Sequence, residues 1–146
     1  YYINIFGVVV LKIILITHGT FSQGILNSLE MILGKQEKFL TISILENCEL
    51  ESIKTGLVAE LEKSNADGED VLFLSDVFFG TPFNLITPLM ENYRFYHITG
   101  VNLPLLMEIV SNREAADIPA MLKEALPLGK EAMIDCVDFF KTALEP

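Results

Sequence analysis

Short apolar runs alternate along the chain with longer amphipathic stretches. Four runs, rich in β-branched residues, span positions 8–17, 39–45, 71–76 and 95–101. Strands that are covered on both faces read as almost continuous apolar segments, which is typical of parallel sheets. The alternation therefore predicts an α/β fold, in which buried parallel strands form a sheet with helices on its faces.

Amphipathic spacing predicts the helices between these runs. Apolar residues recur at helical intervals over 24–33 and over 50–61, which predicts two crossover helices. A third helix is expected to begin at Thr81, because a hydroxyl residue at the N-cap followed by Pro82 is a favoured start. Pro88 is expected to kink or divide this helix.

The C-terminal third of the chain is less regular. Helices are expected over 103–112 and over 117–126, the second with Asp117 as its cap. The last stretch, 129–144, allows two interpretations: a helix with apolar residues near one face, or a short edge strand within 133–137.

The charge balance narrows the range of partners. Ten Lys and Arg against 20 Asp and Glu give a formal net charge of −10, spread along the chain. Nucleic-acid binding depends largely on clustered Lys and Arg, so neither nucleic acid nor an anionic membrane is an expected partner. With 51% hydrophobic residues among 146, the chain is expected to fold as one domain rather than remain disordered.

The beginning of the chain is apolar but is not expected to enter a membrane. Asn4 and Lys12 interrupt the run, and no basic residue precedes it, so neither a membrane span nor a signal peptide is expected. The chain does not begin with Met. We therefore expect a single domain over 10–146, with 1–9 as an additional N-terminal segment of uncertain origin.

Cysteine usage indicates neither a metal site nor a disulfide framework. Cys48 and Cys136 lie far apart, without CxxC or Cys/His spacing. Unpaired thiols of this kind are typical of a reducing compartment. The expected location is cytoplasmic, and no metal is expected.

Chemistry is expected just beyond the carboxyl ends of the strands, where open parallel sheets bind their ligands. His18 follows the first run and Asp76 ends the third, so both belong to the same edge. A carboxylate that accepts one imidazole N–H fixes the tautomer and leaves the other nitrogen as a nucleophile. His18 and Asp76 are the candidate catalytic pair; the alternatives are a structural histidine and an aspartate that caps the following turn.

Residues near this pair are suited to an anion. Gly19 lets the backbone approach a substrate, and the helix that follows presents N–H groups that favour phosphate. The Thr81 hydroxyl and nearby amides are expected either to cap the third helix or to hold phosphoryl oxygens. His97 lies inside the fourth run and is expected to be structural.

Four motifs occur in order: THG after the first run, MILG at the end of the first helix, VLFLSDxxxGTPFN and GVNLPLLME. Over roughly residues 11–140 this order resembles the enzyme IIA component of the mannose/fructose/sorbose class of the bacterial phosphoenolpyruvate:sugar phosphotransferase system. The resemblance implies a three-layer α/β/α fold with a mostly parallel four-stranded sheet of order 2-1-3-4. It also implies a homodimer that exchanges a C-terminal strand, which would explain the ambiguous tail.

The same resemblance implies a phosphoryl relay. His18 is expected to take a phosphoryl group from a small histidine-phosphorylated carrier protein and to pass it to an enzyme IIB domain, with Asp76 orienting the imidazole. Gly80 and Thr81, together with Gly19, are the expected phosphoryl-binding positions. No metal or other cofactor is expected, because positioning and anion stabilisation suffice for transfer between two imidazoles.

One departure from the family pattern affects this site. The family usually has glycine where Phe79 stands, and a side chain there limits how closely the backbone approaches phosphate. Three other functions remain open: the phosphocarrier subunit of dihydroxyacetone kinase, a noncatalytic flavin- or nucleotide-binding module using Thr17, Thr20 and Ser22, and a regulatory module. GTPFN and GVNLP favour the sugar-transport class, and the first loop lacks a glycine-rich dinucleotide motif.

Overall fold

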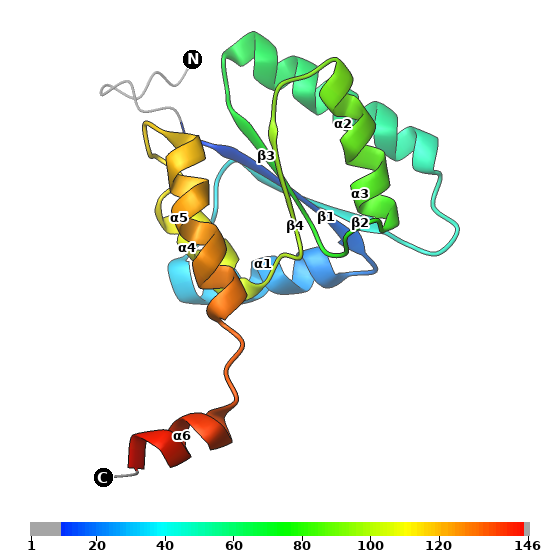
Figure 1. Cartoon of the computed structure of the whole chain (residues 1–146). Helices are drawn as coiled ribbons and strands as arrows, with labels where there is room; N and C mark the ends of the chain where they lie inside the picture. The colour runs from blue at the N-terminus through cyan, green and yellow to red at the C-terminus, as the bar shows by residue number, and fades with distance from the viewer. Residues whose placement is uncertain (1–9, 145–146) are drawn as a thin grey trace.

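The sheet at the centre of the protein is four-stranded and parallel. A computed structural model describes residues 10–144. Its strands lie in the order β2-β1-β3-β4 (Figure 1) and are β1 (Lys12–His18), β2 (Phe39–Ile44), β3 (Val71–Ser75) and β4 (Tyr96–Thr99). Parallel strands covered on both faces account for the apolar runs. The predicted α/β class, the parallel sheet and the 2-1-3-4 order are confirmed.

The first apolar run is longer than the strand it forms. β1 begins at Lys12, so positions 10 and 11 precede it, and His18 is its last residue rather than the first residue of a loop. The N–H of Leu11 donates to the carbonyl of Arg113 at 3.1 Å, which takes this residue out of the strand ladder. Expected strand positions 8 and 9, like the rest of the segment 1–9, lie outside the described residues.

Helices cover both faces of the sheet, so the three expected layers are present (Figure 1). One face carries α1 (Phe21–Leu33), α4 (Leu103–Ser111) and α5 (Ile118–Glu131). The opposite face carries α2 (Leu50–Asp67), α3 (Thr81–Ile86) and the 3-10 helix η1 (Thr87–Glu91). α2 runs past its predicted end at 61. It ends at Asp67, because Gly68 adopts the left-handed conformation that closes a helix.

Alternating side chains along β1 build two apolar cores. Ile13 and Leu15 point into the layer of α1, α4 and α5, whereas Ile14 and Ile16 point into the layer of α2 and α3. All four side chains are fully buried. Because β1 has a neighbouring strand on each side and helices over each face, the carboxyl end of β1 is held firmly, and His18 with it.

Pro88 divides the third helix, as predicted. α3 ends at Ile86, and η1 follows directly. Thr81 is not the N-cap, however: Gly80 takes that position with an extended backbone, and Thr81 is the first helical residue. The prediction is wrong by one residue because Pro82 is tolerated throughout the first turn, where its missing N–H would have no helical partner.

Polar side chains start α4 and α5. Asn102 caps α4, and Asp117 caps α5 by accepting an N–H of its first turn at 3.0 Å, which confirms the predicted cap. α5 continues through Pro127, beyond its predicted end. The helix continues past this proline because its last turns pack closely on α4. A Cβ at Gly129 would lie only 2.7 Å from the Cβ of Leu105.

The tail is helical, as one of the two predictions had it, but the helix begins later than expected. α6 (Cys136–Leu144) follows an irregular segment at 133–135, and the alternative edge strand over 133–137 does not form. Asp135 starts α6, because its carboxylate accepts the Val137 N–H at 2.9 Å. Figure 1 shows α6 apart from the sheet and its helices. Within the described residues the last strand is β4, so the exchanged C-terminal strand has no counterpart there.

Candidate active site

The strand order creates a topological switch point between β1 and β3. The chain leaves β1 for β2 on one side and returns through α2 to β3 on the other side. Ligands of open α/β sheets bind outside the carboxyl ends of the strands at such a point. His18 ends β1 and Asp76 directly follows β3, so both candidate catalytic residues lie there.

His18 and Asp76 are hydrogen-bonded across 58 positions of sequence. Asp76 Oδ2 accepts the backbone N–H of His18 at 2.8 Å and lies 2.9 Å from His18 Nδ1. The His18 side chain is 46% exposed, whereas that of Asp76 is 12% exposed. When Nδ1 donates to the carboxylate, Nε2 carries the free lone pair of a neutral imidazole.

The surroundings of Asp76 keep it ionised. Burial opposes ionisation, but hydrogen bonds from the backbone and imidazole of His18 outweigh it and lower the pKa of the Asp76 carboxyl below its ordinary value. The other oxygen, Oδ1, accepts the Val77 N–H at 2.9 Å. One carboxylate thus fixes the turn after β3 and contacts the imidazole, so the capping and catalytic interpretations are compatible.

Gly80 gives the imidazole room. A Cβ at this position would lie 2.8 Å from His18 Cε1, which is closer than a real Cβ approaches a neighbour. The N–H of Gly80 donates to the carbonyl of Val77 at 3.0 Å. In the same way, the N–H of Gly19 donates to the carbonyl of Ile44 at 2.9 Å. Both glycine amides are therefore engaged within the protein.

The three expected phosphoryl-binding positions contribute a sharp turn, open space and a hydroxyl, respectively. Gly19 turns the chain from β1 into α1 with a φ of 56°, in the left-handed region that favours glycine. Gly80 provides space beside the imidazole. Thr81 does not cap α3, so its hydroxyl is not committed to a helix amide.

Two of the three hydroxyls expected to serve a ligand in the first loop face inward, whereas Thr20 is exposed. Thr17 and Ser22 are fully buried, and Thr17 Oγ1 accepts the Ser22 N–H at 2.8 Å. The Ser22 hydroxyl lies 3.3 Å from the carbonyl of Ile42 and 3.3 Å from the hydroxyl of Ser43. One amide of the first turn of α1 is thereby used internally. Thr17 and Ser22 present no group to a ligand phosphate, which weakens the flavin or nucleotide interpretation.

Phe79 adopts an unusual backbone conformation beside the pair. Its φ of 59° lies in the left-handed region, which costs a bulky residue about 1–2 kcal/mol. Asn84 stabilises this conformation, because its Nδ2 donates to the Phe79 carbonyl at 3.0 Å. This role of Asn84 was not predicted from the sequence, where its place shortly after a turn is the only signal for it.

His97 makes internal contacts. Its Nε2 lies 3.0 Å from Ser75 Oγ, and its ring packs on Phe83 with 5.4 Å between ring centroids. Burial lowers the pKa of His97 to about 4, so the ring is neutral at neutral pH. The partner Ser75 could not be named from sequence, because the pairing of β3 with β4 brings the two together.

Three further observations concern residues 10–144. No three side chains of His, Cys, Asp or Glu gather there in a way that would hold a metal ion. None of the helices in this part of the chain combines the length and the apolar character that a membrane crossing requires. Cys48 packs beside the α2 core and Cys136 is exposed, both as free thiols.

Comparison with known proteins identifies a family and several relatives of this chain. Residues 12–126 match the EIIA-man model, described as the fructose IIA component of the PTS, the phosphotransferase system. The chain is 27% identical over 127 residues to the fructose-specific EIIA component of Bacillus subtilis (strain 168), with 86% of each chain covered. It is 32% identical over 127 residues to the mannose-specific EIIAB component of Escherichia coli (strain K12), covering 84% of this chain but 38% of that longer protein.

Solved structures agree with these matches. An EIIA component from Streptococcus agalactiae superposes with a TM-score of 0.77 at 31% identity, covering 86% of this chain and 96% of that one. The mannose/sorbose specific IIA subunit from Enterococcus faecalis superposes with a TM-score of 0.74 at 25% identity, covering 84% and 92%. Matches of this extent define the class as EIIA components of the phosphotransferase system. Within that class the chain belongs to the EIIA-man family, the mannose and fructose components of sugar transport.

Proposed function

We propose that this chain relays a phosphoryl group, which His18 accepts from a histidine-phosphorylated carrier protein and passes to an enzyme IIB domain. The observation that carries the proposal is the 2.9 Å hydrogen bond between His18 Nδ1 and Asp76 Oδ2. With the proton on Nδ1, the attacking atom is Nε2 of a half-exposed imidazole. Membership of the EIIA-man family supports the same reaction.

Transfer between two imidazoles balances without net movement of a proton. The P–N bond of the donor breaks as a new P–N bond forms at His18 Nε2. The donor ring, protonated at its other nitrogen, leaves as neutral imidazole, while His18 keeps its Nδ1 proton and becomes a cationic ring. The Asp76 carboxylate offsets this positive charge through Oδ2. The reverse of these steps, with a histidine of the IIB domain as acceptor, passes the phosphoryl group on.

Three neighbouring residues are proposed to bind or frame the phosphoryl group. Thr81 offers a hydroxyl that does not cap α3. Gly80 leaves space beside His18 Cε1, and Gly19 allows the sharp turn into α1. In-line transfer depends on positioning and on stabilisation of the phosphoryl charge, so the relay as proposed uses no metal or other cofactor.

The alternatives have less support. A flavin or nucleotide module would need ligand groups from the first loop, where Thr17 and Ser22 are buried and engaged and Thr20 alone of the three is exposed. For the dihydroxyacetone kinase subunit and for a purely regulatory module, no contact among residues 10–144 gives specific support. Free thiols suit a reducing compartment, and we propose that 10–146 acts as one IIA domain in the cytoplasm.

Intact mass spectrometry tests the relay. The chain is incubated with phosphoenolpyruvate, enzyme I and the carrier protein, and is then weighed. Wild type is expected to gain one acid-labile phosphoryl group and His18→Ala none, whereas His97→Gln, a change at the other histidine, still gains it. Absence of the group from wild type with a competent donor would overturn the proposal, as would an equal gain by His18→Ala.

We also propose that two copies of the chain associate through the tail. α6 and the segment before it expose large apolar side chains, which are Met133, Ile134, Val137, Phe139 and Phe140. A helix of nine residues is only marginally stable in water by itself, and contiguous exposed apolar surface is typical of an interface. Packing against a second copy would supply the burial that this helix lacks.

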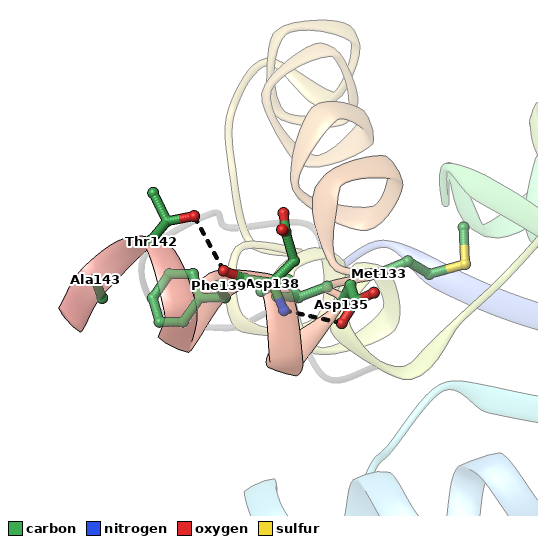
Figure 2. Close-up of a pocket in the computed structure, with 7 residues that line it drawn as sticks. Met133, Asp135, Asp138, Phe139, Thr142 and Ala143 are labelled. Atoms are coloured by element: carbon green, nitrogen blue, oxygen red, sulfur yellow. Dashed lines mark hydrogen bonds between the residues drawn. The ribbon is translucent and has the colours of Figure 1, made fainter. Parts of the chain in front are cut away.

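Figure 2 shows a pocket on this tail. Its walls come only from the segment before α6 and from α6 itself, with Met133 and Phe139 among them. Neither His18 nor the loop after β3 contributes to it. The surface proposed for association is therefore distinct from the catalytic pair.

Light scattering after size exclusion tests this association. Wild type is expected to elute with the mass of a dimer, and a double variant with Val137→Asp and Phe140→Asp with the mass of a monomer. Met31→Asp, which also changes an exposed apolar residue but lies on α1, is expected to stay dimeric. A monomeric wild type at tens of micromolar would contradict the proposal.

A further inference from the structure

We infer that Phe79 is a docking residue for the phosphoryl donor protein and that a strained turn holds its ring outward. This inference rests on the proposed relay and deepens it. It concerns a group of three rings, Phe78, Phe79 and Phe83, which we call the aromatic patch. The first two lie in the loop between β3 and α3, and the third lies in the first turns of α3.

The rings of the aromatic patch pack on one another and remain open to solvent. Ring centroids are 4.1 Å apart for Phe78 and Phe79, 5.0 Å for Phe78 and Phe83, and 5.3 Å for Phe79 and Phe83. Phe83 also packs on His97, which connects the patch to β4. Phe78 is 59% exposed and Phe79 is 69% exposed. The patch is thus built on the fold yet presents two rings outward.

The backbone of Phe79 is strained in this arrangement. Its φ of 59° is a conformation that glycine adopts without steric cost and that phenylalanine does not. An outward ring recovers little of that cost, because most of its surface stays in water. Strained conformations of this kind persist where the surroundings fix them, as the Asn84 side chain does here, and they cluster at functional sites.

The loop that carries the patch contacts the catalytic imidazole at both of its ends. Before Phe78, the Asp76 carboxylate is hydrogen-bonded to His18. After Phe79, Gly80 lies against His18 Cε1. A donor protein must bring its phosphorus to about 3–3.5 Å from His18 Nε2 before transfer. Because Asp76 and Gly80, at the two ends of this loop, lie at the imidazole, the surface of a bound donor is expected to reach the exposed rings between them.

The occupant that fits is a phosphohistidine protein with an apolar face beside its phosphoryl group. Exposed aromatic rings gain strongly from burial in an interface, where they are frequent anchors. The formal charge of −10 gives no long-range attraction to a phosphoryl group, so short-range apolar contact is the source of affinity that this surface can supply.

The test compares a protein donor with a small one in the same variants. Phosphorylation of His18 is followed by intact mass with the phosphorylated carrier at increasing concentration, and separately with phosphoramidate, which has no protein surface. The variants are Phe79→Gly, which removes ring and strain together, and Phe78→Ala, which removes a ring alone. Met31→Ala, an exposed apolar change on α1, is the matched control.

For Phe79→Gly and Phe78→Ala, KM for the carrier is expected to rise about tenfold with kcat within twofold. The ratio of carrier efficiency to the phosphoramidate rate accordingly falls about tenfold, whereas Met31→Ala leaves the ratio unchanged. Thermal unfolding of Phe79→Gly is expected at or above the wild-type midpoint, since the strain is removed.

An unchanged carrier KM in both ring variants would overturn the docking role and leave the relay intact. An equal loss with both donors would also overturn it, because the rings would then act on the imidazole and not on the partner. Absence of any transfer from the carrier to wild type would overturn the relay together with the docking role.

Discussion

Replacing Asp76 by asparagine removes the charge of the carboxylate while keeping its shape. In wild type, Oδ2 accepts two N–H groups of His18, at 2.8 and 2.9 Å, and Oδ1 accepts the Val77 N–H at 2.9 Å. An amide has one oxygen and one NH2 group. If the oxygen faces His18, the NH2 opposes the Val77 N–H. If it faces Val77, the NH2 donates to Nδ1 and moves the imidazole proton to Nε2, which blocks the nucleophile.

The size of the effect follows from these contacts. A hydrogen bond to a charged group contributes about 1.5–3 kcal/mol, and the variant loses at least one such bond from the charged phosphoimidazole state. A loss of about 2–3 kcal/mol in the transition state is expected to slow the proposed phosphorylation of His18 about 30- to 150-fold, at 1.36 kcal/mol per factor of ten.

Rapid quench followed by intact mass measures this rate with saturating phosphorylated carrier. Asp67→Asn is the matched control, because it removes the same charge from an exposed position at the end of α2 and is expected to transfer at the wild-type rate. Unfolding midpoints show whether each variant is folded. A folded Asp76→Asn protein that transfers within twofold of wild type would refute the orienting and charge-stabilising role.

Three further predictions concern Gly80 beside the imidazole, the buried histidine and the hydrophobic core. Gly80→Ala displaces the imidazole of His18 and is expected to slow transfer at least tenfold in quench assays, whereas Gly24→Ala, with open space around its Cβ, does not. The pKa of His97 is lowered to about 4 in the folded protein, so the unfolded chain takes up this proton more readily. The contribution of His97 to the free energy of unfolding is therefore complete above pH 6.5 and is lost as the pH falls toward 4. In urea titrations between pH 7 and 4.5, wild type should lose up to about 2.5 kcal/mol more than His97→Gln, and equal losses would contradict this. Phe73→Ala, which empties a fully buried site beside Phe95, is expected to lower the free energy of unfolding by about 3–5 kcal/mol in the same titrations, and a loss below 1 kcal/mol would show that the core refills.

Local patterns were reliable where one physical effect dominates. The buried run that forms β3 is apolar from Val71 to Leu74, so its type and its start could be predicted, and its predicted end at 76 was one residue too late. The cap at Asp117 is equally local, since an aspartate satisfies amides only a few residues away. Errors arose where distant contacts decide. Helix α5 passes Pro127 because it packs on α4, and no pattern within its own sequence shows that contact.

Predictions about the candidate site divide in the same way between local and distant effects. Placing His18 and Asp76 at strand ends required only the apolar runs and the rule that ligands bind at the carboxyl edge. That they are bonded to each other depends on β1 and β3 being neighbours, which the order of elements along the chain does not specify and which only the resemblance implied. The left-handed Phe79 and the role of Asn84 were not predicted, because backbone strain is set by the surrounding structure and not by residue type.

By itself, the sequence determined the α/β class, the buried strands and the strand-end residues available for chemistry, because burial imposes a periodicity that each segment carries independently. The tertiary structure decided which of those residues meet, how much of the imidazole stays exposed and where the tail helix lies. Contacts between residues far apart in the chain form only once the strands have paired in one order, and that order is a property of the whole fold.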